Sequence, residues 1–414
     1  MPQALHTHRL ANGMVLVAEP MPWLESVAFA LLTPAGCAVD PADRLGLANF
    51  TSEMVQRGCG ERDSRKFLED LELLGADYSS AVSISHSSFS AAMPAENLTG
   101  VLPIFADMVL RPLLPEDQLE AARLVCMQDV RAMEDDVVQL VREELRLRRY
   151  GEPLGRANHG RIETLEAITI DDVRRCFQQN YQPSDAILSV AGKFDWPALR
   201  DQVESLFGDW RPVDAPPLQV HPPLLGHRHL QHDTSQTHIG VSFASVPYRH
   251  ADYYQARGAI GVLSDGASSR LFTEIREERG LVYSVHASCH SLREQGAVFC
   301  YAGTSSQRAQ ETLDVLLAEL NRIRQGVQAD ELDRLKAQFK TSLVLQQESS
   351  RARAAVMAGD WYHLQRVRTL EEVQRVVSGI TRETVNAYLA ALPPFDFSIV
   401  TLGNQELEIP VAVS

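Results

Sequence analysis

Apolar positions along the chain recur with two spacings, one typical of helices and one typical of strands. In the segment 45–57, Leu47, Phe50 and Met54 are three and four residues apart, which predicts a helix with one buried stripe. Short apolar runs at 26–32 and 186–192 are flanked by turn residues and predict strands. Strands come as meanders and helices in runs, so the pattern predicts an α+β protein with mostly antiparallel sheets covered by helices.

The order of these elements occurs twice. Two short phrases recur at a separation of 205 residues: Gly75-Ala76-Asp77-Tyr78-Ser79 with Gly280-Leu281-Val282-Tyr283-Ser284, and Thr164-Leu165-Glu166 with Thr369-Leu370-Glu371. Solenoid proteins repeat about every 20–50 residues, so this much longer period indicates a duplicated domain. We therefore predict two homologous domains, at residues 1–211 and 227–414.

A change in composition separates the two halves. Residues 212–226 have little apolar periodicity and contain Pro212, Pro216, Pro217, Pro222 and Pro223. Prolines at this density favour an extended and rather stiff backbone. The segment 212–226 is therefore predicted to be a linker between the domains.

Composition and charge exclude several classes of function. The 414-residue chain has a formal net charge of −15, which disfavours binding to nucleic acid or to anionic membranes. No apolar run is long enough to span a bilayer, and the N-terminal residues do not resemble a signal peptide.

The six cysteines are scattered without a C-x-x-C pair, as expected for reduced thiols. We expect a cytoplasmic protein; a periplasmic location would require that a signal segment had been removed. Acidic runs at 134–136 and 143–144 suggest a preference for basic peptides.

The segment 268–284 predicts a helix that ends at Gly280 and leads into a strand. Ser268 or Ser269 can cap the start of this helix, because a hydroxyl accepts a hydrogen bond from a free N–H of the first turn. The arrangement brings Arg276, in the last turn, near Tyr283 on the strand. On this segment alone, the simpler interpretation is that Arg276 offsets the helix dipole and Tyr283 fills the core.

Four segments resemble the pitrilysin/insulinase superfamily of zinc peptidases, and most closely its short, processing-peptidase-like bacterial branch. They are 46–54, where the family has its zinc helix, 150–156, 206–210 and, most specifically, 269–284. The resemblance covers nearly the whole chain, including the duplication. It implies that the two domains together form a half-clamshell.

The chain departs from the family at the metal site. Active members read H-x-x-E-H, with a further glutamate downstream; two histidines and that glutamate hold zinc, and the inner glutamate is the general base. The resemblance places Asn49, Ser52 and Glu53 at the motif positions and Asp129 at the distal one. Ser52 is too weak a base to take a proton from water at neutral pH. No zinc or other cofactor is therefore expected in this chain.

The resemblance also implies a function without a metal. In two-chain members of the family, one chain holds the zinc and the other supplies an arginine and a tyrosine seven positions apart, the spacing of Arg276 and Tyr283. The first half has Tyr78 but Leu71 in place of the arginine, so Tyr78 is expected to belong to the core. We therefore expect a zinc-free subunit that forms a heterodimer with a zinc-bearing homologue, contains the catalytic residues Arg276 and Tyr283, and acts on peptides.

Two alternatives remain at this stage. The chain could be an inert structural core protein or a peptide-binding protein of the same fold. It could also be a homodimer that binds a metal other than zinc at Asn49, Glu53 and Asp129, because hard cations accept oxygen ligands.

Overall fold

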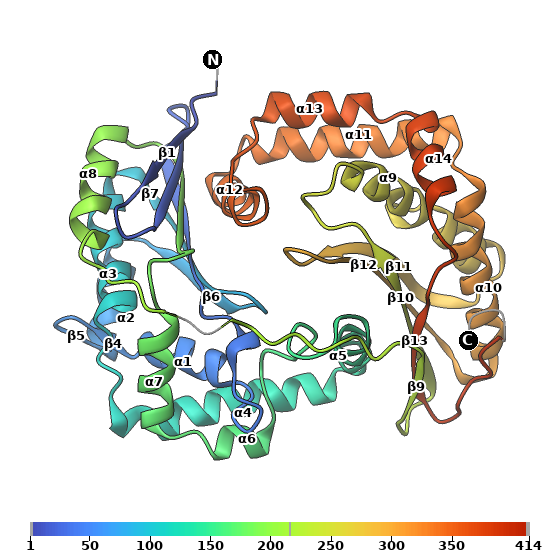
Figure 1. Cartoon of the computed structure of the whole chain (residues 1–414), viewed down its shortest axis with the longest axis horizontal. Coiled ribbons are helices and arrows are strands. Elements are labelled where there is room, and N and C mark those ends of the chain that lie inside the picture. Colours follow the sequence, from blue (N-terminus) through green and yellow to red (C-terminus); the bar gives the residue numbers. More distant parts are fainter. Residues whose placement is uncertain (1–2, 215–216, 411–414) are drawn as a thin grey trace. The chain divides into compact units, whose positions relative to one another are not determined.

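A computed structural model describes residues 3–214 and 217–410 (Figure 1). Contacts between residues divide the chain into two compact units. Unit 1 contains Met1–Ala132, Arg156–Val220 and Val344–Thr369, and unit 2 contains Met133–Gly155, His221–Leu343 and Leu370–Ser414. The units therefore interleave along the sequence, whereas the predicted domains are continuous. Pro216, in the predicted linker, lies outside the described residues, and the described part of 212–226 has no helix or strand.

Unit 1 contains a six-stranded sheet in the order β1-β2-β8-β3-β7-β6. All neighbouring strands are antiparallel except β2 and β8. The strands are β1 (His6–Arg9), β2 (Val15–Pro20), β3 (Ser26–Thr33), β6 (Asp77–Val82), β7 (Ser87–Pro94) and β8 (Ile187–Gly192). A separate two-stranded ribbon pairs β4 (Gly58–Cys59) with β5 (Arg62–Asp63).

Helices cover both faces of this sheet. The larger core contains the predicted stripe of Leu47, Phe50 and Met54, all buried, so that prediction is confirmed. The helices of unit 1 are α1 (Leu47–Val55), α2 (Ser64–Leu73), α3 (Leu98–Leu110), α4 (Leu119–Asp135, whose last turn belongs to unit 2), α6 (Ile162–Glu166), α7 (Ile170–Asn180), α8 (Trp196–Phe207) and α12 (Ser350–Leu364). Helix α12, from the second half of the sequence, packs Met357 against the other face of the sheet.

Unit 2 contains a five-stranded sheet in the order β11-β12-β10-β13-β9, antiparallel except for β13 and β9. The strands are β9 (His227–Gln231), β10 (Gln236–Ser245), β11 (Val282–Ser291), β12 (Gly296–Ser305) and β13 (Ser398–Gly403). The helical elements are α5 (Val137–Tyr150), α9 (Tyr253–Ser264), η4 (Phe272–Glu278), α10 (Ala309–Arg322), α11 (Ala329–Gln346, whose end belongs to unit 1), α13 (Leu370–Gly379) and α14 (Arg382–Ala391).

One face of the unit 2 sheet forms the core, and the other is partly covered by α5. Ile239, Val298 and Ala302 pack beneath the helices of the core face. On the opposite face, Val141 and Leu145 of α5 pack against β13. Each unit therefore takes one helix from the opposite half of the sequence. Both units are mixtures of sheet and covering helices, as the α+β prediction requires.

Candidate functional site

Helix α1 presents the positions that correspond to the family's metal ligands. Asp40 fixes the start of α1, because its carboxylate accepts hydrogen bonds from the backbone N–H groups of Gly46 and Ala48 at 2.9 and 2.8 Å. Burial raises the pKa of Asp40 to about 7, although these hydrogen bonds oppose the shift. Asp40 was not predicted from the sequence; its role is to cap the helix.

The side chains of this helix do not form a zinc site. Asn49 is half-buried, and Ser52 is only 3% exposed. The Glu53 carboxylate is already paired with the Arg57 guanidinium at 2.8 Å. Burial raises the pKa of the Cys126 thiol to about 12, and the negative charges of Glu53 and the exposed Asp129 add to the shift. Zinc prefers imidazole and thiolate, and no motif position supplies either.

Within residues 3–214 and 217–410, no group of three or more His, Cys, Asp or Glu side chains is arranged to hold a metal ion. The donor set on α1 and α4 therefore does not fit the zinc that the family resemblance implies for its active members.

The other predicted pair lies on η4 and β11 of unit 2. Leu271 and Ile275 are fully buried and anchor the helix to the core. Gly280 has a φ of +58°, the left-handed conformation expected where this helix ends. The predicted serine cap is wrong: η4 has no side-chain cap, and the buried Ser269 hydroxyl has no hydrogen-bond partner. The first turn is closed by the backbone, with the Thr273 N–H donating to the Ser269 carbonyl oxygen at 2.9 Å.

Two backbone irregularities occur within the segment. Residues Phe272–Glu278 form a π-helix rather than an α-helix. The pairing of β11 with β12 then shifts between Val282 and Ser284, which makes Tyr283 the extra residue of a β-bulge. Both features are enriched near functional sites, and a bulge redirects the side chain of its extra residue.

The bulge places Tyr283 on the open side of the strand. Tyr283 is 85% exposed, and Ser284 after it is exposed as well, whereas Val282 and Ala287 are in the core. Two consecutive exposed residues in a strand are the expected result of a bulge, because regular strands alternate. The interpretation that Tyr283 fills the core is therefore wrong.

Arg276 and Tyr283 lie together. The guanidinium carbon of Arg276 is 5.9 Å from the centroid of the Tyr283 ring and 4.8 Å from that of Phe272. Both distances are within the range of cation–π interactions. In the part of the chain that the structure describes, no carboxylate lies within 4.0 Å of the Arg276 guanidinium. Its N–H groups are therefore not engaged by an acidic partner.

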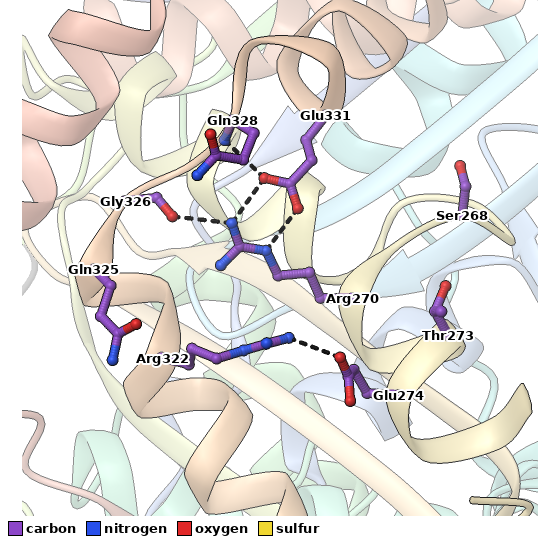
Figure 2. A pocket seen from close by; sticks show the side chains of 9 residues that line it. All are labelled: Ser268, Arg270, Thr273, Glu274, Arg322, Gln325, Gly326, Gln328 and Glu331. Carbon is purple, nitrogen blue, oxygen red and sulfur yellow. Dashed lines mark hydrogen bonds and ion pairs between the residues drawn. The ribbon is translucent and has the colours of Figure 1, made fainter. Parts of the chain in front are cut away.

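The opposite side of η4 is held by ion pairs around a cavity of about 440 Å³ (Figure 2). Arg270 forms two hydrogen bonds of 2.7 Å to the Glu331 carboxylate and a third to the Gly326 carbonyl oxygen. Arg322 contacts Glu274 at 3.0 Å. Figure 2 shows both guanidiniums directed at these carboxylates. These ion pairs fix η4 and Arg270, two residues before it, against α10 and α11.

A further cluster surrounds His286, which is on the same strand as Tyr283. The Nη2 atom of Arg142, on α5, is 2.9 Å from His286 Nε2. The His286 ring lies 5.4 Å from that of Tyr301, whose hydroxyl is 2.6 Å from His238 Nδ1. Sequence analysis did not find Arg142, because α5 is more than a hundred residues from β11 and nothing in its own pattern distinguishes this arginine.

Within the described residues, no helix is both long and apolar enough to cross a membrane.

Two family models match successive segments of the chain. Residues 15–159 match the family model "Insulinase (Peptidase family M16)", and residues 167–339 match "Peptidase M16 inactive domain". The uncharacterized zinc protease YmxG of Bacillus subtilis is 26% identical over 402 residues, which cover 95% of this chain and 96% of that protein. An uncharacterized zinc protease of Rickettsia felis is 23% identical, with coverages of 93% and 94%.

Solved structures with this fold cover nearly the whole chain. A structure described as a peptidase M16 inactive domain from Pseudomonas fluorescens has a TM-score of 0.89 at 20% identity, and covers 98% of this chain and 99% of its own. A protease from Helicobacter pylori has a TM-score of 0.88 at 18% identity, with coverages of 97% and 99%. The resemblance seen in the sequence is confirmed: the chain belongs to the insulinase family of peptidases, peptidase family M16.

Proposed function

We propose that this chain is the zinc-free subunit of a two-chain M16 peptidase and supplies Arg276 and Tyr283 to a zinc-bearing homologue. The observation that carries the proposal is the exposed Arg276–Tyr283 pair, which lies at two backbone irregularities and has no acidic partner among the described residues. The absence of a fitting zinc donor set on α1 supports a division of labour between two chains.

The chemistry of the pair suits peptide hydrolysis. When a metal-bound hydroxide adds to a peptide carbonyl, negative charge develops on the carbonyl oxygen, and a phenol O–H can donate to it. A guanidinium can hold a neighbouring carbonyl oxygen of the same peptide and orient the bond to be cleaved. The zinc in the partner would supply the hydroxide; Tyr283 would bind the oxyanion and Arg276 would position the peptide.

The first test is reconstitution. The chain is mixed with a zinc-bearing homologue that carries the H-x-x-E-H motif, and cleavage of a fluorogenic peptide is measured. Activity should require both chains, and Arg276→Ala should lower kcat/KM about 100-fold, the scale of a lost charge-assisted contact made in the transition state. Equal rates for wild type and Arg276→Ala, in a mixture that is active, would contradict the proposed role.

The main alternative is a peptide-binding or structural protein of the same fold. One of the similar structures is described as complex III2 from Candida albicans (TM-score 0.84, 18% identity, covering 97% of this chain). A homodimer with a hard cation at Asn49, Glu53 and Asp129 is the other alternative. Elemental analysis of the purified chain tests the metal-binding homodimer. One bound metal ion per chain would favour this alternative, and no bound metal would contradict it.

A further inference from the structure

Among the described residues, a second cation without a carboxylate partner, Arg142 of α5, contacts the strand that contains Tyr283. Arg142 is exposed, and the group that it contacts is the imidazole of His286. In the described part of the chain, no carboxylate lies within 4.0 Å of its guanidinium. By contrast, Arg148 and Arg149 on the same helix are paired with Glu144 and Asp396. Arg142 therefore retains a full positive charge in a chain of net charge −15.

The His286 ring holds Arg142 without cancelling its charge. A guanidinium can only donate hydrogen bonds, so Nε2 of His286 accepts and its ring is neutral. Burial, together with the nearby Arg142 charge, lowers the pKa of His286, which keeps the ring neutral at pH 7. Asp136, at the start of α5, accepts hydrogen bonds from the backbone N–H groups of Val138 and Gln139. Arg142 still has N–H groups to donate to a ligand.

Rings on three neighbouring strands form the base of this site. His286 on β11 is paired in register with Tyr301 on β12, and the Tyr301 hydroxyl is hydrogen-bonded to His238 on β10. The His238 and Tyr301 rings are stacked, with centroids 6.0 Å apart. These contacts fix the imidazole and, through it, the direction of the Arg142 guanidinium.

The separation between Tyr283 and His286 along β11 corresponds to a number of residues in a bound peptide. Tyr283 and His286 are three residues apart on β11, which corresponds to about 10 Å at roughly 3.3 Å per residue. The bulge puts the exposed Tyr283 and Ser284 on the side of the strand opposite to the core residue Ala287. If an extended peptide runs along β11 with a carbonyl at Tyr283, a side chain about three residues away reaches Arg142.

We propose that Arg142, held by His286, binds a carboxylate of the peptide substrate about three residues from the bond that is cleaved. The carboxylate would belong either to an Asp or Glu side chain or to the C-terminus of a short peptide. This inference rests on the proposed function, which makes Tyr283 the reference point. It also predicts a local preference opposite to the one expected from the acidic runs and the net charge.

The test begins with the isolated full-length chain and needs no zinc-bearing partner. Fluorescence anisotropy measures the affinity for two labelled peptides that differ only in one Glu or Gln, and for each peptide with a free or an amidated C-terminus. We expect the Glu peptide to bind about 10-fold more tightly, the scale of one charge-assisted hydrogen bond, and Arg142→Gln to abolish the difference. Arg142→Lys should retain most of it, because the charge remains.

The four peptides distinguish the two possible sources of the carboxylate. A preference for the free C-terminus over the amide identifies the terminal carboxylate as the ligand, and a preference for Glu identifies a side chain. Arg382→Gln, a change of an exposed arginine on α14, is the matched control and should leave both preferences unchanged. Equal affinities for all four peptides, or no binding of any of them, would overturn the proposal.

Cleavage by the reconstituted pair then gives the register. When a single Glu is moved along a neutral peptide, kcat/KM should be highest with Glu two to four residues from the cleaved bond, and Arg142→Gln should remove that maximum. A flat profile in the wild type would contradict the subsite. Tyr283→Phe is measured on the same neutral peptide, with Arg382→Gln as the control that should leave its cleavage unchanged. A failure of Tyr283 to affect catalysis is therefore recognised separately from a failure of the Arg142 subsite.

Discussion

Tyr78 and Tyr283 occupy corresponding places in the two halves of the chain but have different surroundings. Tyr78 is half-buried and lies edge-on to Phe67 and Phe105, with centroids 6.1 and 6.3 Å away. Burial raises its pKa. Tyr283 is 85% exposed and is near a guanidinium instead. The same Gly-x-x-Tyr-Ser phrase therefore supplies a half-buried residue packed against the core in one unit and an accessible phenol in the other.

The backbone explains the difference. Strand β6 pairs with β7 in unbroken register from Asp77 to Val82, and the helix before it, α2, is a regular α-helix. In the second half, the helix is a π-helix and the strand has a bulge at the tyrosine. Where the arginine would be in the first half, Leu71 is buried in the core. The corresponding segments of the two halves therefore differ in local backbone geometry: the first is regular, and the second has the irregularities that surround the candidate site.

The largest effect that we predict comes from giving the first half the arginine of the second. Leu71 is 1% exposed, so Leu71→Arg would bury an unpaired charge and lower the free energy of unfolding by about 4 kcal/mol or more. Arg276→Leu, the reverse exchange at an exposed position, should change stability by only about 0.5 kcal/mol. Urea unfolding followed by circular dichroism measures both. Similar losses for the two variants would show that the halves do not differ as described.

A smaller effect is expected from the ion pair that fixes η4. Glu331→Gln leaves the half-buried Arg270 without its carboxylate and should cost about 1–3 kcal/mol in the same urea experiment. Arg334→Gln is the control, because it removes an exposed pair on the same helix and should cost less than about 0.5 kcal/mol.

The contribution of Glu331 should also depend on pH. Burial opposes ionisation, but the hydrogen bonds from Arg270, the backbone hydrogen bond from Gln328 and the charge of Arg270 together outweigh it, and the pKa of Glu331 is lowered. A carboxyl with a lowered pKa in the folded state stabilises the protein above its unfolded pKa, and this stabilisation is lost as pH falls through the folded value. The difference in stability between wild type and Glu331→Gln should therefore shrink below about pH 4. A constant difference down to pH 3 would mean that the carboxylate charge is unimportant.

The sequence predicted regular elements well and irregular ones poorly. The apolar stripe of Leu47, Phe50 and Met54 and the duplicated order of strands follow from burial, which is periodic along a helix or strand. The π-helix and the bulge break that periodicity, so the exposure of Tyr283 could not be deduced from alternation. Family resemblance identified Arg276 and Tyr283, whereas Arg142 reaches the site only through tertiary packing of α5 on a sheet from the other half of the sequence.

The central claim is that Tyr283 takes part in another chain's reaction while Tyr78 does not. The most direct test is kcat for peptide cleavage by the reconstituted two-chain enzyme, with Tyr283→Phe or Tyr78→Phe in this chain. Each change removes one hydroxyl and little else. The account predicts that Tyr283→Phe lowers kcat by about 10²–10³-fold, the effect of losing one oxyanion donor, while Tyr78→Phe changes it by less than about twofold. Equal values of kcat for the two variants would contradict it.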